Sequence, residues 1–70
     1  MEYTVILHPA EEGGYWTEVP VLQGCLSQGE TVEDTLRNIK EAIESHLIAL
    51  KAEGLQPPKD RTMVFSHVEL

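Results

Sequence analysis

Cys25 carries the most reactive side chain of the sequence, because a thiolate is a strong nucleophile. It follows Gly24, and no lysine, arginine or histidine lies within ten positions of it. A thiol is activated by a nearby cation or by a helix that begins at it, and the sequence offers neither. Free cysteines of this kind are commonly small buried apolar residues. We therefore expect Cys25 in the core rather than in a catalytic site.

Metal-binding and phosphate-binding patterns are weak in this sequence. His67 and Glu69 are two positions apart, so on a strand they would share a face and could offer two metal ligands. No further cluster of cysteines and histidines adds to them. The glycine pair Gly13-Gly14 lacks the lysine and the following helix of a phosphate-binding loop, and the acids that follow Gly29 would repel an anion. The sequence predicts no metal and no cofactor.

The other titratable residues favour surface roles. His8 is followed by a proline and then by Glu11 and Glu12, which is typical of a solvated turn. Carboxylates on turns and strand edges most often keep the surface soluble, although they can act as acid–base catalysts. We predict that the protein is not an enzyme. The alternative is a hydrolase that uses Cys25 or the glutamates.

Tyr15, Trp16 and Glu18 form the most specific chemical feature. On a strand, Tyr15 would point to one face, and Trp16 and Glu18 to the other. If a single helix covers only one face, one of the two aromatic rings must lie on the uncovered face. Aromatic residues anchor protein interfaces. We predict that these three residues contact a partner protein; the alternative is that both rings pack in the core.

Three short strands are expected to position these residues. Tyr3–His8 is rich in β-branched and aromatic residues, as is Tyr15–Val19. Gly13-Gly14 between them can adopt the positive φ angles of a tight hairpin. A third short strand is expected around Gly24–Leu26, and Gln28–Glu30 has the composition of a turn. The sequence thus predicts an antiparallel three-stranded meander.

A long helix is expected from Val32 to Glu53. The Thr31 hydroxyl can cap its first turn, where acidic residues complement the helix dipole. Gly54 is expected to end the helix, and Pro57-Pro58 prevents its continuation. Its apolar residues recur at spacings of three and four, at Val32, Leu36, Ile39, Ile43, Leu47 and Leu50.

Thr62–Val68 is predicted to form a fourth strand, which gives an α+β fold of order β-β-β-α-β with one helix on one sheet face. A helix of about 33 Å would outreach strands of about 20 Å. Leu47, Ile48 and Leu50 would then overhang the sheet. We expect these three residues to form a homo-oligomer interface, a dimer or tetramer, rather than to be covered by residues 55–59 of the same chain.

Length and charge limit the possible partners. The 70 residues, 1–70, suffice for one small domain, with twelve acidic residues against five basic ones and a net charge of −7. Such a surface disfavours nucleic acid and suits a basic partner. No apolar run reaches the roughly 20 residues that span a bilayer, and no export signal opens the chain. A single cysteine fits the reducing cytoplasm. We therefore expect a cytoplasmic module that binds neither membranes nor nucleic acid directly.

An ordered set of residues resembles the HicB antitoxin family over residues 3–58. The set comprises Tyr3, Gly14-Tyr15, Pro20, Gly24-Cys25, Gly29-Glu30-Thr31, Glu33, Asp34, Asn38, Glu41-Ala42-Ile43, Gly54 and Pro57-Pro58. The resemblance implies a HicB-like fold, similar to a degenerate piece of the RNase H architecture without its catalytic acids. It also implies a partner, a small basic mRNA-cleaving toxin of the HicA type, which the antitoxin binds and neutralises.

The sequence departs from the family pattern at several positions. Val21 stands where the family often has aspartate, and Gln23 where a second proline is common. The C-terminal DNA-binding domain of many members has no counterpart before Leu70. Operator binding is therefore not expected. The alternative function is a homo-oligomeric structural or regulatory module without a toxin partner.

Overall fold

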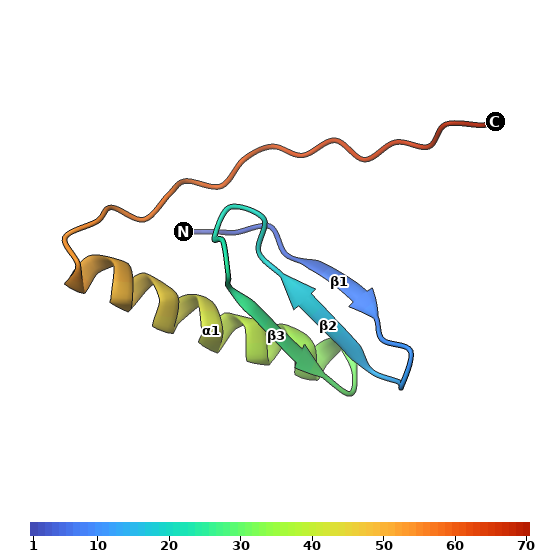
Figure 1. The fold of residues 1–70 in the computed structure, drawn as a ribbon, viewed down its shortest axis with the longest axis horizontal. Helices are drawn as coiled ribbons and strands as arrows, with labels where there is room; N and C mark the ends of the chain where they lie inside the picture. Colours follow the sequence, from blue (N-terminus) through green and yellow to red (C-terminus); the bar gives the residue numbers. More distant parts are fainter.

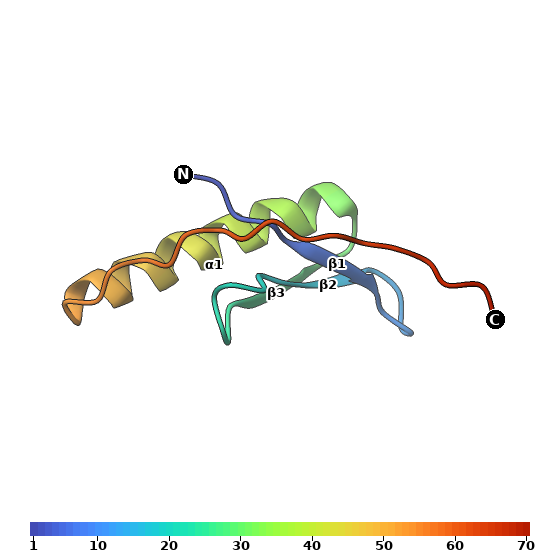
Figure 2. The same ribbon diagram turned by 90° about the horizontal axis from the view of Figure 1, so that it is seen from above.

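The fold is a three-stranded antiparallel sheet with one long helix on one of its faces. The computed structural model describes residues 1–70. Strands β1 (Ile6–Pro9), β2 (Tyr15–Glu18) and β3 (Leu26–Gly29) lie in the order β1-β2-β3, and helix α1 (Val32–Ala52) follows them (Figure 1). Seen along the sheet, the helix occupies one side only (Figure 2). The predicted meander and the single helix are confirmed.

Strands β1 and β3 begin later than the sequence suggested, whereas β2 begins at Tyr15 as predicted. Residues 3–5 precede β1 without pairing in the sheet, although Tyr3 and Val5 pack against the core. The third strand expected around Gly24–Leu26 starts only at Leu26, because the residues before it close a tight loop. In that loop the N–H of Leu22 donates to the carbonyl of Val19 at 3.0 Å, and Gly24 has a φ of 83°. Gln28 and Gly29, expected in a turn, belong to β3.

Helix α1 begins and ends where local signals predict. The Thr31 hydroxyl accepts a hydrogen bond from the N–H of Asp34 at 3.0 Å, which caps the first turn. The helix ends at Ala52, and Gly54 takes the left-handed conformation with a φ of 76°. No helix of the chain has the length and apolar character needed to cross a bilayer.

A small core lies between α1 and the sheet. Its fully buried apolar residues are Val19, Leu22, Cys25 and Ile39. Thr17 and Thr35 are also completely buried, and both hydroxyls donate to backbone carbonyls, of Ile6 at 2.8 Å and of Thr31 at 2.7 Å. Because these bonds satisfy the two hydroxyls, the polar groups can be buried at little cost.

Gly29 allows the first turn of α1 to contact β3 directly. A Cβ at this position would lie 2.6 Å from the backbone nitrogen of Thr35 and 2.7 Å from its hydroxyl. A Cβ at Gly14, whose φ is 73°, would likewise lie 2.6 Å from the carbonyl oxygen of Gly29. The hairpin, β3 and the helix therefore meet at a point that has no room for side chains at residues 14 and 29.

The predicted fourth strand is wrong. Residues 55–70 run extended along the β1 side of the molecule, and Thr62–Val68 pairs with no strand. The Thr4 N–H and hydroxyl both donate to the carboxylate of Asp60, at 3.0 and 2.8 Å, and the Tyr3 hydroxyl donates to the Pro58 carbonyl at 2.6 Å. A side-chain carboxylate thus takes the N–H that a strand ladder would use. Beyond Asp60 the chain diverges from β1 (Figure 1).

The C-terminal half of α1 extends past the sheet, as expected (Figure 1). Leu47 and Leu50 are half-buried and pack against the edge of the core, whereas Ile48 is 70% exposed. The helix therefore leaves one large apolar side chain in solvent at this end. A role for these three residues in self-association stays a prediction.

Gly29→Ala is expected to lower the free energy of unfolding by about 1–3 kcal/mol, the usual cost of forcing an extra carbon into a packed contact. Urea unfolding followed by circular dichroism measures it. Gln28→Ala, one residue earlier and exposed, is the control and should change the value by less than about 0.5 kcal/mol. An unchanged unfolding midpoint for Gly29→Ala would contradict the close contact with Thr35.

Hydrogen bonds from the Thr4 hydroxyl and then from its N–H hold the pKa of the Asp60 carboxyl below its ordinary value of 3.8. A lowered pKa means that the contact is fully present above the ordinary value and is lost as the pH falls through the lowered one. We expect the amide proton resonance of Thr4 to move only below pH 3.8. Asp60→Ala should give the acid-state resonance already at neutral pH, and Glu69→Ala should not. A Thr4 resonance indifferent to acid and to Asp60→Ala would refute the contact.

Candidate partner-binding surface

The face of the sheet opposite α1 is a continuous surface of alternating strand residues. Thr17 is completely buried toward the helix, so its neighbours in β2, Trp16 and Glu18, point the other way. The pairing register adds their cross-strand partners from β1 and β3. We call the resulting set the open face; it comprises Ile6, His8, Trp16, Glu18, Leu26 and Gln28.

His8 contacts two other residues at the centre of the open face, Trp16 and Glu18. His8 lies opposite Trp16 in the register, and their rings stack with centroids 4.0 Å apart and planes inclined by 15°. The Nε2 atom of His8 lies 2.6 Å from a carboxylate oxygen of Glu18. Trp16 remains 41% exposed. The histidine therefore fixes the orientation of an exposed indole ring before any partner arrives, which lowers the entropic cost of binding.

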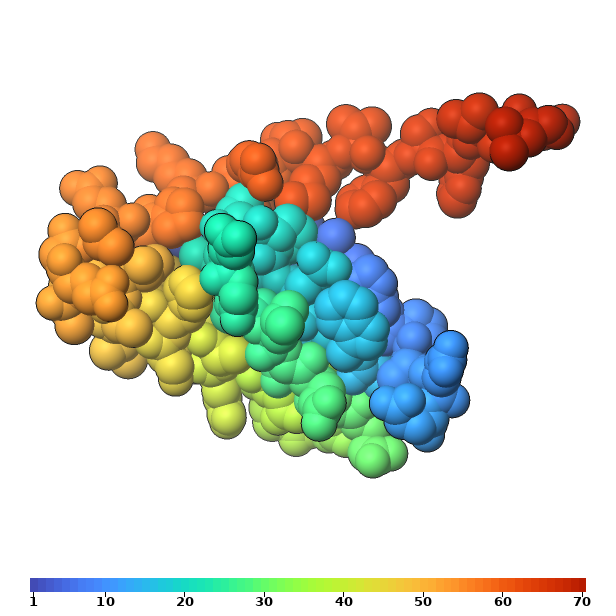
Figure 3. All heavy atoms as spheres, viewed as in Figure 1, coloured from blue at the N-terminus to red at the C-terminus, as the bar shows by residue number.

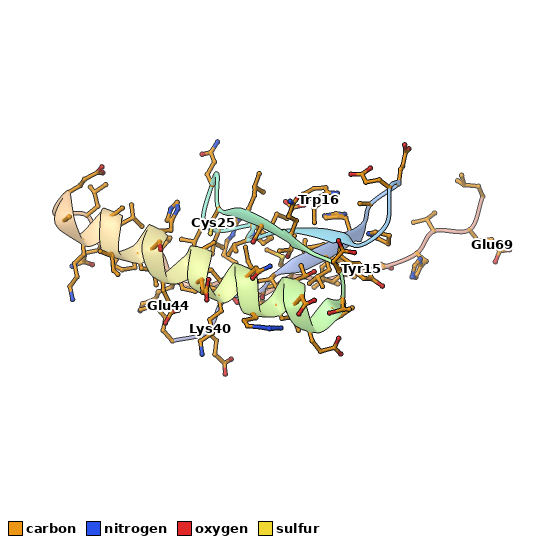
Figure 4. The ribbon with its side chains drawn as sticks, turned by 90° about the horizontal axis from the view of Figure 1, so that it is seen from below. Tyr15, Trp16, Cys25, Lys40, Glu44 and Glu69 are labelled. Carbon is orange, nitrogen blue, oxygen red and sulfur yellow. The ribbon has the colours of Figure 1, made fainter.

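Tyr15 does not share this surface. Its side chain is half-buried and points away from Trp16, toward the first turn of the helix (Figure 4). It lines a hollow of about 600 Å³ between the hairpin loop and the start of α1, together with Glu30 and Arg37. The structure thus brings Trp16 and Glu18 together and places Tyr15 at the border of the same region, since Trp16 also lines the hollow.

Acidic residues surround this end of the sheet. Glu11 and Glu12 are exposed in the hairpin loop, and Glu30 is exposed directly after β3. The register pairs Pro9 with Tyr15 and Tyr15 with Gly29, so the loop and the end of β3 lie at the same end of the sheet. We call these three glutamates the acidic end. A positively charged partner is attracted to it, and the exposed indole adjoins it.

The residues that the sequence offered for catalysis or metal binding lie outside the open face. Cys25 is 4% exposed, and burial raises the pKa of its thiol, which disfavours the reactive thiolate. His67 and Glu69 lie on the exposed C-terminal segment, where Figure 4 shows Glu69 far from the other labelled residues. No three histidine, cysteine, aspartate or glutamate side chains are placed to hold a metal ion.

The contact of His8 with Trp16 was not predicted from the sequence. The sequence predicted His8 as the last residue of the first strand and gave it only a surface role beside a solvated turn. The structure places it within β1, and the loop occupies residues 10–14. A signal was present: counting outward from the middle of the hairpin, at Glu12, pairs residue 8 with residue 16. The symmetry of the hairpin alone therefore places His8 opposite Trp16.

Comparison with known proteins extends the resemblance seen in the sequence. The family described as HicB-like antitoxin of bacterial toxin-antitoxin system matches residues 3–68. A UPF0150 protein of Thermoplasma acidophilum is 45% identical over 60 residues, which cover 86% of this chain and 87% of that protein. A UPF0150 protein of Synechocystis is 45% identical over 62 residues, covering 89% and 78%. Antitoxin HicB 1 of Photorhabdus laumondii is 42% identical over 43 residues, covering 61% of this chain and 28% of that antitoxin.

His8→Ala is expected to free the indole ring of Trp16 and to lower the free energy of unfolding by about 0.2–1 kcal/mol, the range for one cross-strand pair. Acrylamide quenching of the single tryptophan reports the change, and the quenching constant should rise. His46→Ala, a half-buried histidine on the helix, is the matched control and should leave quenching unchanged. Equal quenching in the two variants would show that the stacked pair does not exist in solution.

Proposed function

Since this chain belongs to the HicB-like antitoxin family, we propose that it binds and neutralises a small, basic, mRNA-cleaving toxin of the HicA type in the cytoplasm. The observation that carries the proposal is the exposed Trp16 beside the acidic end, stacked on His8, which is in turn paired with Glu18. The mode of action is occlusion: the antitoxin covers the surface with which the toxin binds RNA and performs no catalysis itself.

Charge and aromatic contact have separate roles in this mechanism. The net charge of −7 attracts a basic toxin and raises the rate of encounter, an effect that salt weakens. The indole ring then slows dissociation, since buried tryptophans dominate the energetics of interfaces. One ring face of Trp16 is stacked on His8, and a lysine or arginine of the toxin can contact the remaining indole surface.

Tyr15 belongs to the same proposal as a contact at the border. Its ring lines the hollow that also contains Glu12, Glu30 and Asp34. Arg37 also lines the hollow, but its guanidinium is paired with Asp34, so a basic side chain of the toxin that enters meets the carboxylates of Glu12 and Glu30 and an aromatic ring together. We therefore assign Trp16 and Glu18 to the centre of the interface and Tyr15 to its margin.

The second candidate is a homo-oligomeric structural or regulatory module without a toxin partner. The exposed Ile48, together with the half-covered Leu47 and Leu50, favours it. The two functions differ in an observation that needs no purified protein: a toxin partner requires a short reading frame for a basic protein next to this gene.

Trp16→Ala is expected to weaken the complex with the small basic protein encoded next to this gene by roughly 30-fold, equivalent to about 2 kcal/mol. Glu18→Ala should weaken it less, and mainly at low salt. Isothermal titration calorimetry and rescue of growth on co-expression measure the effects. Glu41→Ala removes an exposed carboxylate of the helix and is the charge-matched control. Absence of a complex, or equal affinities for Trp16→Ala and Glu41→Ala, would refute the proposal.

A further inference from the structure

The C-terminal segment 61–70, here called the C-terminal arm, exposes a large amount of apolar surface. Val64, Phe65 and Val68 are 86%, 74% and 82% exposed. Figure 3 shows the arm projecting from the rest of the molecule. The radius of gyration is 13.8 Å, whereas a compact domain of this length has about 11 Å. Three large apolar side chains exposed within five residues are more than scattered surface apolar residues, and they point to an interaction site.

The arm and strand β1 both have unpaired backbone groups. No backbone–backbone hydrogen bond outside the helix and strands involves a residue after Leu55, and the arm belongs to no strand. β1 pairs with β2 only, so its other edge is open. An extended apolar segment and an open strand edge are complementary, since each supplies the donors and acceptors that the other lacks.

The arm is too long to be covered by β1 of its own chain. Asp60 is hydrogen-bonded to Thr4, and from there the arm runs toward the same end of the sheet as β1 while diverging from it (Figure 1). β1 ends at Pro9, so alignment from this contact would leave every arm residue after Phe65 beyond the sheet. Val68 would stay exposed even if the arm closed onto its own strand.

An apolar groove next to β1 could bury the exposed apolar side chains of an arm. It has a volume of about 370 Å³ and lies between the N-terminal residues and α1. Its apolar lining includes Met1, Tyr3, Val5, Leu36, Ile43 and Leu47. A strand added at the β1 edge would present alternate side chains to this groove.

Charge favours a second copy as the source of that strand. Within the arm Arg61 and Glu69 cancel, so the whole net charge of −7 lies in residues 1–60. Two acidic bodies repel each other, whereas a neutral apolar arm can approach an acidic body without that penalty.

We propose that the C-terminal arm of one copy adds as a strand to the β1 edge of a second copy, and reciprocally, so that two chains form a homodimer with exchanged arms. Each copy contributes one arm and receives one, which closes the assembly at two chains. The interface is separate from the open face, so this inference does not depend on the proposed toxin.

Sedimentation equilibrium tests the dimer. The unaltered chain is expected to be dimeric at micromolar concentration. The double variant Val64→Asp/Phe65→Asp is expected to dissociate at least about 100-fold more readily: the two residues point to opposite faces of an added strand, so in either register each arm loses one apolar side chain from the groove and places a charge there. Ala49→Asp is the control: it places a charge on an exposed apolar residue of the helix and should leave the dimer intact, whereas Ile48→Asp probes the helix interface of the second candidate function. A monomeric unaltered chain, or a dimer broken by Ile48→Asp but not by the arm variant, would overturn the proposal.

A mixing experiment separates exchange between chains from closure within one chain. The double variant, labelled with ¹⁵N, is mixed with unlabelled, unaltered chain, so that only the unlabelled copy has a competent arm. Exchange predicts shifted and more slowly exchanging amides at Ile6, Leu7 and His8 of the labelled copy. Unchanged amides show closure within the chain and overturn the exchange. Because the arm contributes nothing to the core, circular dichroism of the variant should match that of the unaltered chain.

Discussion

The close approach of Gly29 to Thr35 determines how the few elements of this protein are arranged. Since neither Gly29 nor Gly14 has a side chain, the first turn of α1 contacts the end of β3 directly. The fully buried Thr35 hydroxyl is satisfied within the helix, so the contact costs no hydrogen bond. The helix is thereby placed over β3 and β2. One face of the sheet and the outer edge of β1 remain uncovered.

These two uncovered regions differ in chemistry. The open face presents a stacked histidine and tryptophan beside carboxylates, which suits a basic protein partner. The β1 edge presents unpaired backbone groups beside an apolar groove, which suits an extended apolar segment. A very small domain buries too little surface to cover both regions by itself. In our proposals, other polypeptides supply the cover: a toxin on the open face and a second copy at the edge.

The sequence by itself determined the features that depend on neighbouring residues. The helix start follows from the Thr31 cap, and its end follows from Gly54, since both signals act within one turn. The alternation of Trp16 and Glu18 against Thr17 follows from the geometry of a strand. The ordered residues from Tyr3 to Pro58 were sufficient to identify the family.

Only the tertiary structure decided the features that depend on residues far apart in the chain. His8 became part of the open face because the hairpin pairs it with Trp16. Cys25, expected in a strand, lies in a loop whose backbone hydrogen bonds join Val19, Leu22 and Cys25, and all three side chains are buried in the core. Thr62–Val68 has strand composition but is not a strand, because a strand forms only where a partner edge lies within hydrogen-bonding distance. Composition can favour an extended chain, whereas the contact between Asp60 and Thr4 determines where that chain runs.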